Sequence, residues 1–304
     1  MMSNIINNRS EILFLYDVSF ANPNGDPVDE NKPRIDEETG INIVTDVRLK
    51  RTIRDYLAEY KGMDVFILET RDESGKLRTK DDRISDFGSN DDIINKCIDV
   101  RLFGATTAVK DKTMTLTGPV QFGFGRSLHK VNMTYIKGTT VMPSQSGNSQ
   151  GTFTEKYILP YSLISFYGIV NENAAKNQNI PLTDDDVDLM LEAMWNGTKN
   201  LMSNSKMGHM PRFLLQVVMK EKNYQIGELN KRIKFVHNVE DEELRDIKDG
   251  RIEIKELIES LNANKGKIEK LRYAVDERAV FAVDGVACDF GDVVKDFPVE
   301  KLGF

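Results

Sequence analysis

The chain has 304 residues, of which 40% are hydrophobic, and its formal net charge is −7. This composition excludes global disorder, and the length fits either two domains or one core with large insertions. The acidic balance argues against a protein that coats nucleic acid with its whole surface, but it is compatible with one narrow basic track.

Cysteine and histidine are too scarce for a disulfide framework or a zinc site. Cys97 and Cys288 lie far apart, and the three histidines do not stand at metal-ligand spacing with them. No apolar run reaches the roughly 18 residues of a membrane span. The N-terminal sequence MMSNIINNRSE has no apolar signal-peptide core. We therefore expect a cytoplasmic protein without cofactor, metal or membrane.

The N-terminal quarter is the most informative part of the sequence. An apolar run predicts a strand over residues 11–20, and a polar loop rich in Asn, Asp and Pro follows it. A helix is predicted from Thr45 to Tyr60, with Thr45 as its N-cap. One face of this helix is apolar, whereas the opposite face carries three basic residues: Lys50, Arg51 and Arg54.

The middle of the chain alternates between apolar runs and polar excursions. Residues 63–69 predict a short strand, and a solvated, charged loop follows to about Asn90. Residues 117–126 predict a strand in which glycines allow close backbone approach. The segment 127–154 is a long polar excursion, which is usually functional in a compact domain.

Residues 157–170 predict a long strand, and 211–219 another. Between them, Thr183 opens a helix and Asp186 completes a capping box. The apolar stripe of this helix is Val187, Met190, Leu191, Met194, Leu201 and Met202. The order strand, helix, strand, strand, helix, strand predicts an α+β, ferredoxin-like or RRM-like fold.

Beyond Lys220 the sequence becomes highly charged. Residues 239–249 and 251–270 predict helices, and 279–283 predict a final strand. We expect this part to decorate the core sheet, although a separate small domain is the alternative.

Three short motifs are rejected. The loop after Asn22 lacks the ligand spacing of a calcium-binding EF-hand. The G-x-S-x-G match at Gly147 has neither the preceding strand nor the following helix of a nucleophile elbow. Leu128 stands where a dinucleotide-binding fingerprint requires its third glycine.

The basic helix is the better candidate for a binding site. A helix N-terminus and guanidinium groups together suit phosphate oxygens. Thr45 supplies the helix start, while Asn24 and Arg34 come from the preceding loop. The alternative is a solvated basic surface without a ligand.

The string NPNGDPVDENKPRIDEETGINIVTDVRLKRTIRDYL resembles the N-terminal signature of a known family. That family is the guide-RNA-binding, RAMP-type backbone subunit of type I CRISPR surveillance complexes (Cascade), with the I-B and I-C branches most similar. The likeness continues through DVRLFGA, GPVQFGFGRS and GTFTEKYILPYSLISFYG. It covers about the first two thirds of the chain.

The resemblance implies one RRM-like palm across residues 1–304. Inserted fingers are expected at about 61–115, a thumb-like hairpin at about 127–154, and a helical C-terminal decoration at about 221–278. Several copies would polymerise as a helical filament along one guide RNA and present it for pairing with target DNA. Other Cascade subunits would bind the filament, and a recruited helicase-nuclease, rather than this chain, would cut the DNA.

The resemblance also implies which residues contact RNA. Apolar side chains such as Met142 or Pro143 would wedge between bases and kink the strand. The expected RNA-binding residues are Asn24, Arg34, Thr45, Lys50, Arg51, Arg54, Gln121, Arg126, His129, Lys130 and Met142.

Two other functions remain open from the sequence. One is an RNA-cleaving ribonuclease of the same RAMP superfamily, for which Asp26, Asp29 or the pair His129 and Lys130 would be the catalytic candidates. The other is an enzyme that binds a phosphorylated ligand on the basic helix. The pattern around His129 favours a hydrogen-bonding surface residue over a general base.

Overall fold

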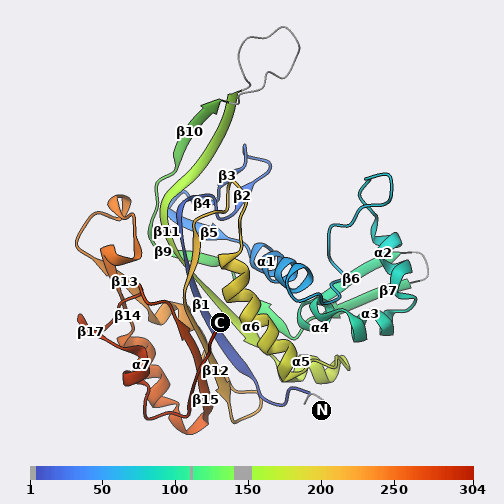
Figure 1. Cartoon of the computed structure of the whole chain (residues 1–304). Coiled ribbons are helices and arrows are strands. Elements are labelled where there is room, and N and C mark those ends of the chain that lie inside the picture. The colour runs from blue at the N-terminus through green and yellow to red at the C-terminus, as the bar shows by residue number, and fades with distance from the viewer. Residues whose placement is uncertain (1–4, 110–111, 140–152) are drawn as a thin grey trace.

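A long, largely antiparallel sheet forms the centre of the molecule in the computed structural model, which describes residues 5–109, 112–139 and 153–304 (Figure 1). Its middle strand is β1 (Ser10–Ala21), which pairs with β11 (Phe153–Val170) on one side and with β12 (His209–Met219) on the other. The strand β9 (Gly125–Lys130) lies beyond β11. The predicted strands at 11–20, 157–170 and 211–219 are therefore confirmed.

The sheet is buried on both faces because β1 supplies apolar side chains to each. Phe14 belongs to the core on one face, and Leu13 and Leu15 belong to the core on the other. This alternation follows from the two-residue period of a strand. It explains why the strand reads as one continuous apolar run.

Two helices cover the first face, α1 (Asp46–Glu59) and α6 (Asp184–Lys199), which lie next to each other (Figure 1). The predicted capping box of α6 is present, because Thr183 and Asp186 bond each other's backbone amides. The end of its predicted apolar stripe is wrong: α6 stops at Lys199, and Met202 beyond it is exposed.

A C-terminal unit covers the second face. Its small sheet contains β13 (Lys234–His237), β14 (Gly250–Glu253), β16 (Phe281–Val283) and β17 (Val286–Cys288), and α7 (Lys255–Ala263) packs beside it. Phe213 of β12 meets Phe281 and Phe290 edge to face, at centroid distances of 4.9 and 4.8 Å. Such aromatic contacts join the unit to the central sheet.

The prediction of helices over 239–249 and 251–270 is largely wrong. Single 3-10 turns stand at η2 (Asp241–Glu243) and η3 (Ile247–Asp249), and α7 is the one α-helix within these two ranges. β15 (Ile268–Val275) begins within the second range and joins the main sheet. A high content of charged residues does not distinguish a helix from a strand, because charged side chains occupy the exposed face of both.

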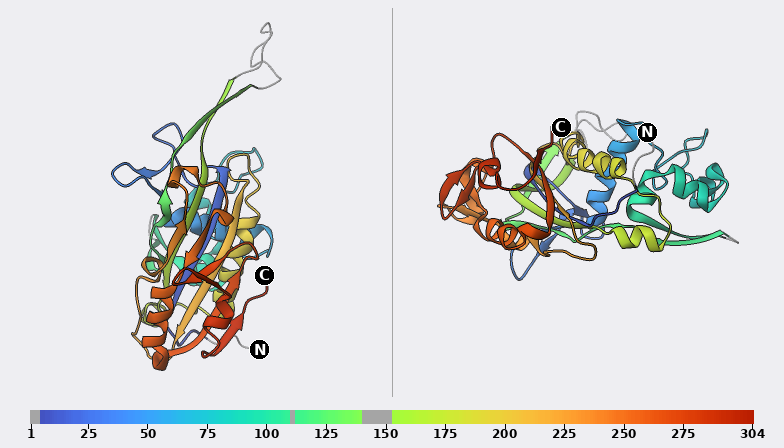
Figure 2. Two further views of the ribbon diagram at one scale, coloured as in Figure 1. Left: turned by 90° about the vertical axis from the view of Figure 1, so that its left-hand side faces the viewer. Right: turned by 90° about the horizontal axis from the view of Figure 1, so that it is seen from below.

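Residues 61–118 form a separate module beside α1, at the opposite end of the body from the C-terminal unit (Figure 2). It contains α2 (Lys80–Phe87), α3 (Asn90–Lys96), α4 (Ile98–Phe103) and the hairpin β6 (Gly104–Val109) with β7 (Lys112–Thr117). A small core of its own includes Phe66, Phe87 and Ile93.

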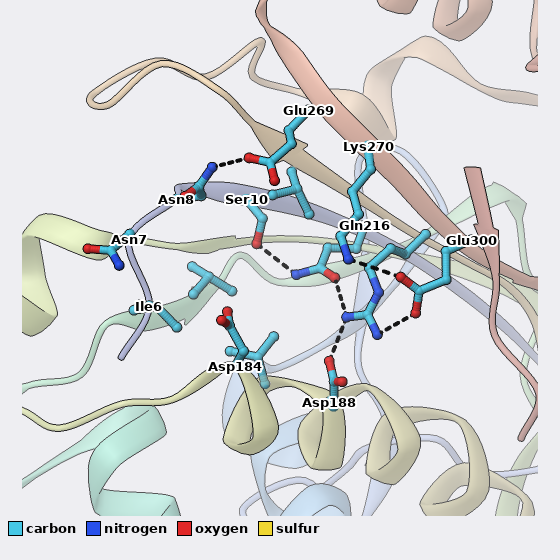
Figure 3. Close-up of a pocket in the computed structure, with 14 residues that line it drawn as sticks. Ile6, Asn7, Asn8, Ser10, Asp184, Asp188, Gln216, Glu269, Lys270 and Glu300 are labelled. Atoms are coloured by element: carbon cyan, nitrogen blue, oxygen red, sulfur yellow. Dashed lines mark hydrogen bonds and ion pairs between the residues drawn. The ribbon is translucent and has the colours of Figure 1, made fainter. Parts of the chain in front are cut away.

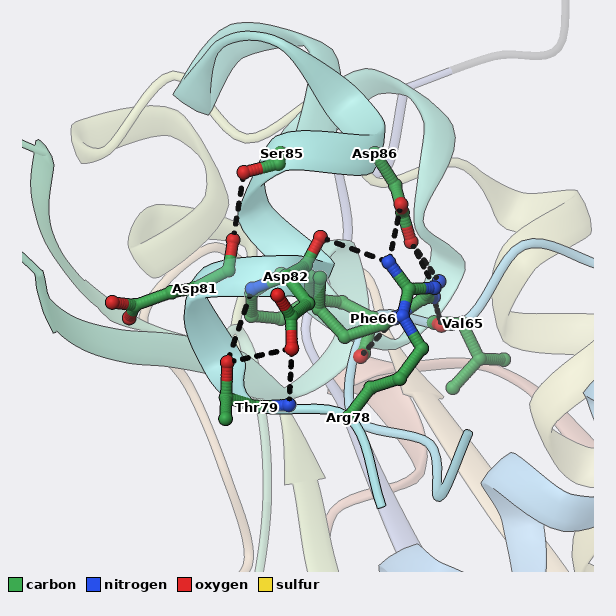
Figure 4. Close-up of polar contacts among 9 residues, drawn as sticks. Val65, Phe66, Arg78, Thr79, Asp81, Asp82, Ser85 and Asp86 are labelled. Atoms are coloured by element: carbon green, nitrogen blue, oxygen red, sulfur yellow. Dashed lines mark hydrogen bonds and ion pairs between the residues drawn. The ribbon is translucent and has the colours of Figure 1, made fainter. Parts of the chain in front are cut away.

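Two predictions fail in this module. Residues 63–69 form no strand, because the carboxylate of Asp99 accepts the backbone N–H groups of Phe66 and Ile67 that a neighbouring strand would otherwise bond. The expected loop to about Asn90 contains α2, which Thr79 and Asp82 start with a capping box (Figure 4). In the same view, Arg78 forms an ion pair with Asp86.

A long hairpin projects from the body (Figures 1 and 2). It consists of β10 (Thr134–Thr139) and the first part of β11, so that Tyr135 lies opposite Tyr157. Residues 140–152, which stand between these two strands in the sequence, lie outside the described residues. The predicted single strand over 117–126 is divided into β8 (Val120–Phe122) and β9.

Within the described part of the chain, no helix combines the length and apolar character needed to cross a membrane.

The remaining elements are short. These short elements are β2 (Gly25–Asp26), β3 (Lys32–Pro33), β4 (Ile35–Asp36), β5 (Ile41–Val44), α5 (Glu172–Asn177), η1 (Leu229–Arg232), η4 (Lys265–Lys267), α8 (Phe290–Val293) and β18 (Val299–Lys301).

Candidate nucleic-acid interface

The loop before α1 and the start of that helix are held together by one amide. Oδ1 of Asn24 accepts hydrogen bonds from the backbone N–H of Thr45 at 2.8 Å and from its hydroxyl at 2.9 Å. Thr45 occupies the predicted N-cap position, but its own side chain makes no capping bond. Asn24 and Thr45 are thus brought together, as a structural pair at the helix start.

The predicted exposed basic face of α1 is wrong for Lys50. Only 7% of this residue is exposed, because β8 and α4 lie against that side of the helix. Nζ of Lys50 donates to Asp46 at 3.0 Å and to Gln121 at 3.1 Å. The structure therefore brings Lys50 and Gln121 together, and leaves Gln121 exposed on β8.

Arg54 is also buried, and its partner is fully buried. Nε of Arg54 donates to Asp99 at 2.9 Å, and its guanidinium lies over the ring of Phe103. Asp99 accepts two backbone N–H groups as well, so all of its charge is compensated by protein. Arg51 is the exposed member of the predicted trio, and it forms an ion pair with Asp55 one turn later.

Two further predicted arginines have single carboxylate partners near the surface. Arg34 forms an ion pair with Asp26 at 3.0 Å, and Arg126 forms one with Asp36 at 3.4 Å. The side chain of Arg126 is 52% exposed. Such exposed pairs contribute about 0–1 kcal/mol, so a phosphate can replace the carboxylate at small cost.

His129 is not the surface residue that the sequence predicted. It is 4% exposed, stacks on Tyr161 at 5.6 Å and accepts the backbone N–H of Leu163 at Nε2. Burial lowers the pKa of His129. Its other ring nitrogen bonds the carbonyl of Lys130, so both nitrogens are occupied by protein. The side chain of Lys130 is exposed at the end of β9.

The acidic candidates for ribonuclease chemistry stabilise a turn. Asp26 pairs with Arg34 and accepts the N–H of Val28, while Asp29 pairs with Lys32. The described residues contain no group of three potential metal ligands. Met142, the predicted wedge, lies outside the described residues.

A polar pocket lies at the end of the sheet opposite the projecting hairpin, and the charged side chains that line it bond one another (Figure 3). Arg272 of β15 forms ion pairs with Asp188 of α6 and Glu300 of β18, and it donates to Gln216 of β12. Gln216 in turn donates to Ser10. This network connects strands and a helix, and we assign it a structural role.

Three basic residues beside the other flank of α1 were not predicted from the sequence. Arg48 lies on the side that faces α6, Lys206 comes from the segment after α6, and His209 is the first residue of β12. The basic run RLKR contained a signal for Arg48. No sequence pattern placed Lys206 or His209 beside it, because the contact depends on how α1 and α6 pack.

Comparisons with known proteins give one consistent result. A family model described as "CRISPR-associated protein Cas7" matches residues 8–255. A "CRISPR-associated protein Cas7" of Haloferax volcanii is 34% identical, over 89% of this chain and 88% of the relative.

Solved structures share the fold. A chain of a "CRISPR RNA-guided surveillance complex" matches with a TM-score of 0.53 and 15% identity, over 88% of this chain and 89% of that chain. A chain of a "CRISPR RNA-guided surveillance complex, pre-nicking" matches with a TM-score of 0.54 and 12% identity, over 88% and 92%.

Proposed function

The chain belongs to the Cas7 family of CRISPR-associated proteins, and from this premise we propose that it is the guide-RNA-binding backbone subunit of a type I Cascade complex. Copies of the chain would line up along the spacer part of the guide and hold its phosphates. The bases would stay free to pair with target DNA, because phosphate contacts fix register without reading sequence. Other Cascade subunits and a recruited helicase-nuclease would be its protein partners.

One observation carries the proposal: a row of exposed polar and basic side chains follows β8 and β9 toward the projecting hairpin. Gln121, Arg126 and Lys130 are the exposed members of this row, and Gln121 is hydrogen-bonded to Lys50 on α1. Arg126 and Lys130 stand on the same side of β9 because they are four residues apart on a strand. Such a row suits a phosphate backbone that passes between α1 and the hairpin.

We assign the parts of the family architecture as follows. The antiparallel order β12, β1, β11, β9, with α1 and α6 on one face, would be an RRM-like palm. Residues of about 61–115 would be the fingers, and the hairpin within about 127–154 would be the thumb. The unit within about 221–278 would support the palm from its second face.

The chain would act as a scaffold and not as an enzyme. Asp26, Asp29 and His129, the candidates for ribonuclease chemistry, each have protein partners that fix a turn or fill the core. A general base needs a free lone pair within reach of the substrate. His129 has none, and its ring is buried.

The test is to purify the chain from cells that express its guide array and partners, and to sequence the bound RNA. We expect discrete RNA of guide length with several protein copies on each RNA. Combined Arg126→Gln and Lys130→Gln substitutions should reduce RNA affinity for all sequences equally, and lower the salt slope by about one unit per lost phosphate contact. Lys231→Gln, on the C-terminal unit, is the matched control. Absence of RNA at low salt would refute the proposal.

A further inference from the structure

Two basic side chains on the α6-facing flank of α1 have no carboxylate partner in the part of the chain that the structure describes. The first is Arg48. One of its terminal nitrogens donates to the hydroxyl of Thr52 at 3.1 Å, and its Nε is buried without any partner. Asp55 attracts it electrostatically, but both carboxylate oxygens of Asp55 are bonded to Arg51. Its positive charge is therefore only weakly compensated.

The second is Lys206, whose Nζ donates to two backbone carbonyls. These are the carbonyls of Asn22 at 2.5 Å and of Pro23 at 3.0 Å. Carbonyl dipoles satisfy its hydrogen bonds but do not neutralise its charge. Burial, and secondly the charge of Arg48, lower the pKa of Lys206 to about 7.

A third nitrogen-bearing side chain, His209, lies beside Lys206. It is almost fully buried and stacks on Tyr16 at 5.7 Å. Nδ1 contacts the carbonyl of Lys206, whereas Nε2 has no partner. Burial, followed by the charge of Lys206, lowers the pKa of His209 to about 3. Within the described residues, the hydrogen bonds of these three groups go to hydroxyl and carbonyl oxygens and not to a carboxylate.

A pocket of about 420 Å³ lies between α1, the end of α6 and the segment after it, and Arg48 and Lys206 line it. Tyr56 and Tyr60 form its aromatic wall, with rings stacked at 5.2 Å and 14°, and Tyr60 is 55% exposed. Glu59 lines the end of the pocket that lies further along α1. Asp55 also lines the pocket, but both of its carboxylate oxygens are bonded to Arg51. The pocket therefore combines two cations, an exposed ring and two acids, one of which is already paired.

Arg48 and Lys206 are half-buried, and Nε of Arg48 is fully buried, whereas a desolvated charge is normally paired. In the same protein, Arg54 and Arg101 each have a buried carboxylate. The exception at Arg48 and Lys206 therefore indicates a partner from outside the chain. An anion would supply the missing charge and would hold Lys206 in its protonated form.

We propose that this pocket binds one nucleotide of a single-stranded nucleic acid, with its phosphate on Arg48 and Lys206 and its base on the exposed face of Tyr60. A phosphodiester has two free oxygens, one for each cation. The base supplies the aromatic partner for Tyr60, which an acidic side chain of a protein would not. Glu59 can accept a hydrogen bond from a sugar hydroxyl or a base amino group.

The pocket is separate from the row on β8 and β9. Arg48 and Lys50 are two residues apart, so they point about 200° apart around α1. That an anion binds follows from the contacts alone, whereas its identity as nucleic acid rests on the proposed function. A nucleic-acid strand that binds both this pocket and the row on β8 and β9 would wrap around α1.

The experiment uses the full chain freed of RNA, with three probes: inorganic phosphate, a hexamer of uridylate and a hexamer of thymidylate. We expect each hexamer to bind, and Arg48→Gln or Lys206→Gln to weaken binding at least 10-fold. Tyr60→Ala should weaken both hexamers but leave phosphate binding unchanged. Lys231→Gln is the control, and equal affinity for the two hexamers assigns recognition to the phosphodiester rather than to the 2′-hydroxyl.

Thermal melting guards against loss of the fold. Phosphate should raise the Tm of the wild-type chain and leave that of Arg48→Gln unchanged, although this variant should melt cooperatively at an equal or higher Tm without ligand. Hexamer binding by Arg48→Gln and by Lys206→Gln that is as strong as binding by the wild-type chain would overturn the proposal. So would tighter binding of a glutamate hexapeptide than of uridylate.

Failure of this site and failure of the proposed function are distinguishable. If guide RNA co-purifies with the wild-type complex but none of the probes depends on Arg48 or Lys206, only the pocket proposal fails. If no guide RNA co-purifies while uridylate binding depends on both residues, only the Cascade assignment fails.

Discussion

The two flanks of α1 hold basic side chains in opposite ways. On the flank facing α4 and β8, Lys50 and Arg54 each bond an acid of the same chain. On the flank facing α6, Arg48 and Lys206 bond hydroxyl and carbonyl oxygens alone, within the described residues. Paired cations fasten the helix to its neighbours, whereas unpaired ones leave charge available for a ligand. A basic residue in the sequence therefore does not by itself indicate a binding site.

The largest expected effect comes from breaking the paired flank. Asp99→Ala removes the partner of Arg54 and of two backbone N–H groups, so we expect a loss of about 3–5 kcal/mol in the free energy of unfolding. Urea denaturation measures it. Asp55→Ala, which breaks the more exposed pair with Arg51 on the same helix, should cost no more than about 1 kcal/mol. Equal losses in the two variants would contradict the assignment of Arg54 to the fold.

The unpaired flank should be visible in the dependence of stability on pH. The pKa of Lys206 falls from 10.5 to about 7 on folding, so between these values the unfolded chain binds more protons than the folded one. Stability therefore rises as pH increases from about 7 to 9. The other charged or titratable groups around Lys206 are Arg48, Asp55, Tyr56, Glu59, Tyr60 and His209.

The variant Lys206→Gln keeps a donor for the two carbonyls but removes the titration. Its unfolding free energy, measured from pH 7 to 9, should change less with pH than that of the wild-type chain. Saturating phosphate should also reduce the slope in the wild-type chain, because an anion favours the charged ammonium. Identical slopes in both proteins would show that folding does not lower the pKa of Lys206.

The smallest effect is expected at the exposed end of the row on β9. Arg126→Gln should change the free energy of unfolding by no more than about 0.5 kcal/mol, since its pair with Asp36 is exposed. The same variant should lower the salt slope of RNA binding by about one unit. An unchanged slope, measured by titration at several salt concentrations, would remove Arg126 from the interface.

Short-range sequence patterns predicted the helices and strands better than they predicted the contacts around them. The bounds of α1 followed from its apolar period, and the start of α6 followed from the capping box at Thr183. The same chemistry at Thr79 was present in the sequence but was overlooked within a charged stretch. These features need only neighbours within four residues, which the sequence displays directly.

The candidate site was less predictable because its partners come from far along the chain. Asp99 lies 45 residues from Arg54, and Gln121 lies 71 residues from Lys50. Their contacts converted an expected basic surface into a buried, paired one. His129 is similar, since the C-terminal unit that helps to bury it begins about 100 residues later.

The strand β11 has a mechanical consequence. Its 18 residues run without interruption from the projecting hairpin into the centre of the sheet, a length of about 60 Å at a rise of about 3.3 Å per residue. A force applied to the hairpin would therefore be transmitted along this one strand to its neighbour β1. The projecting hairpin can be lengthened only by two residues in each strand at a time, which adds about 6–7 Å. A single inserted residue would turn every later side chain to the opposite face.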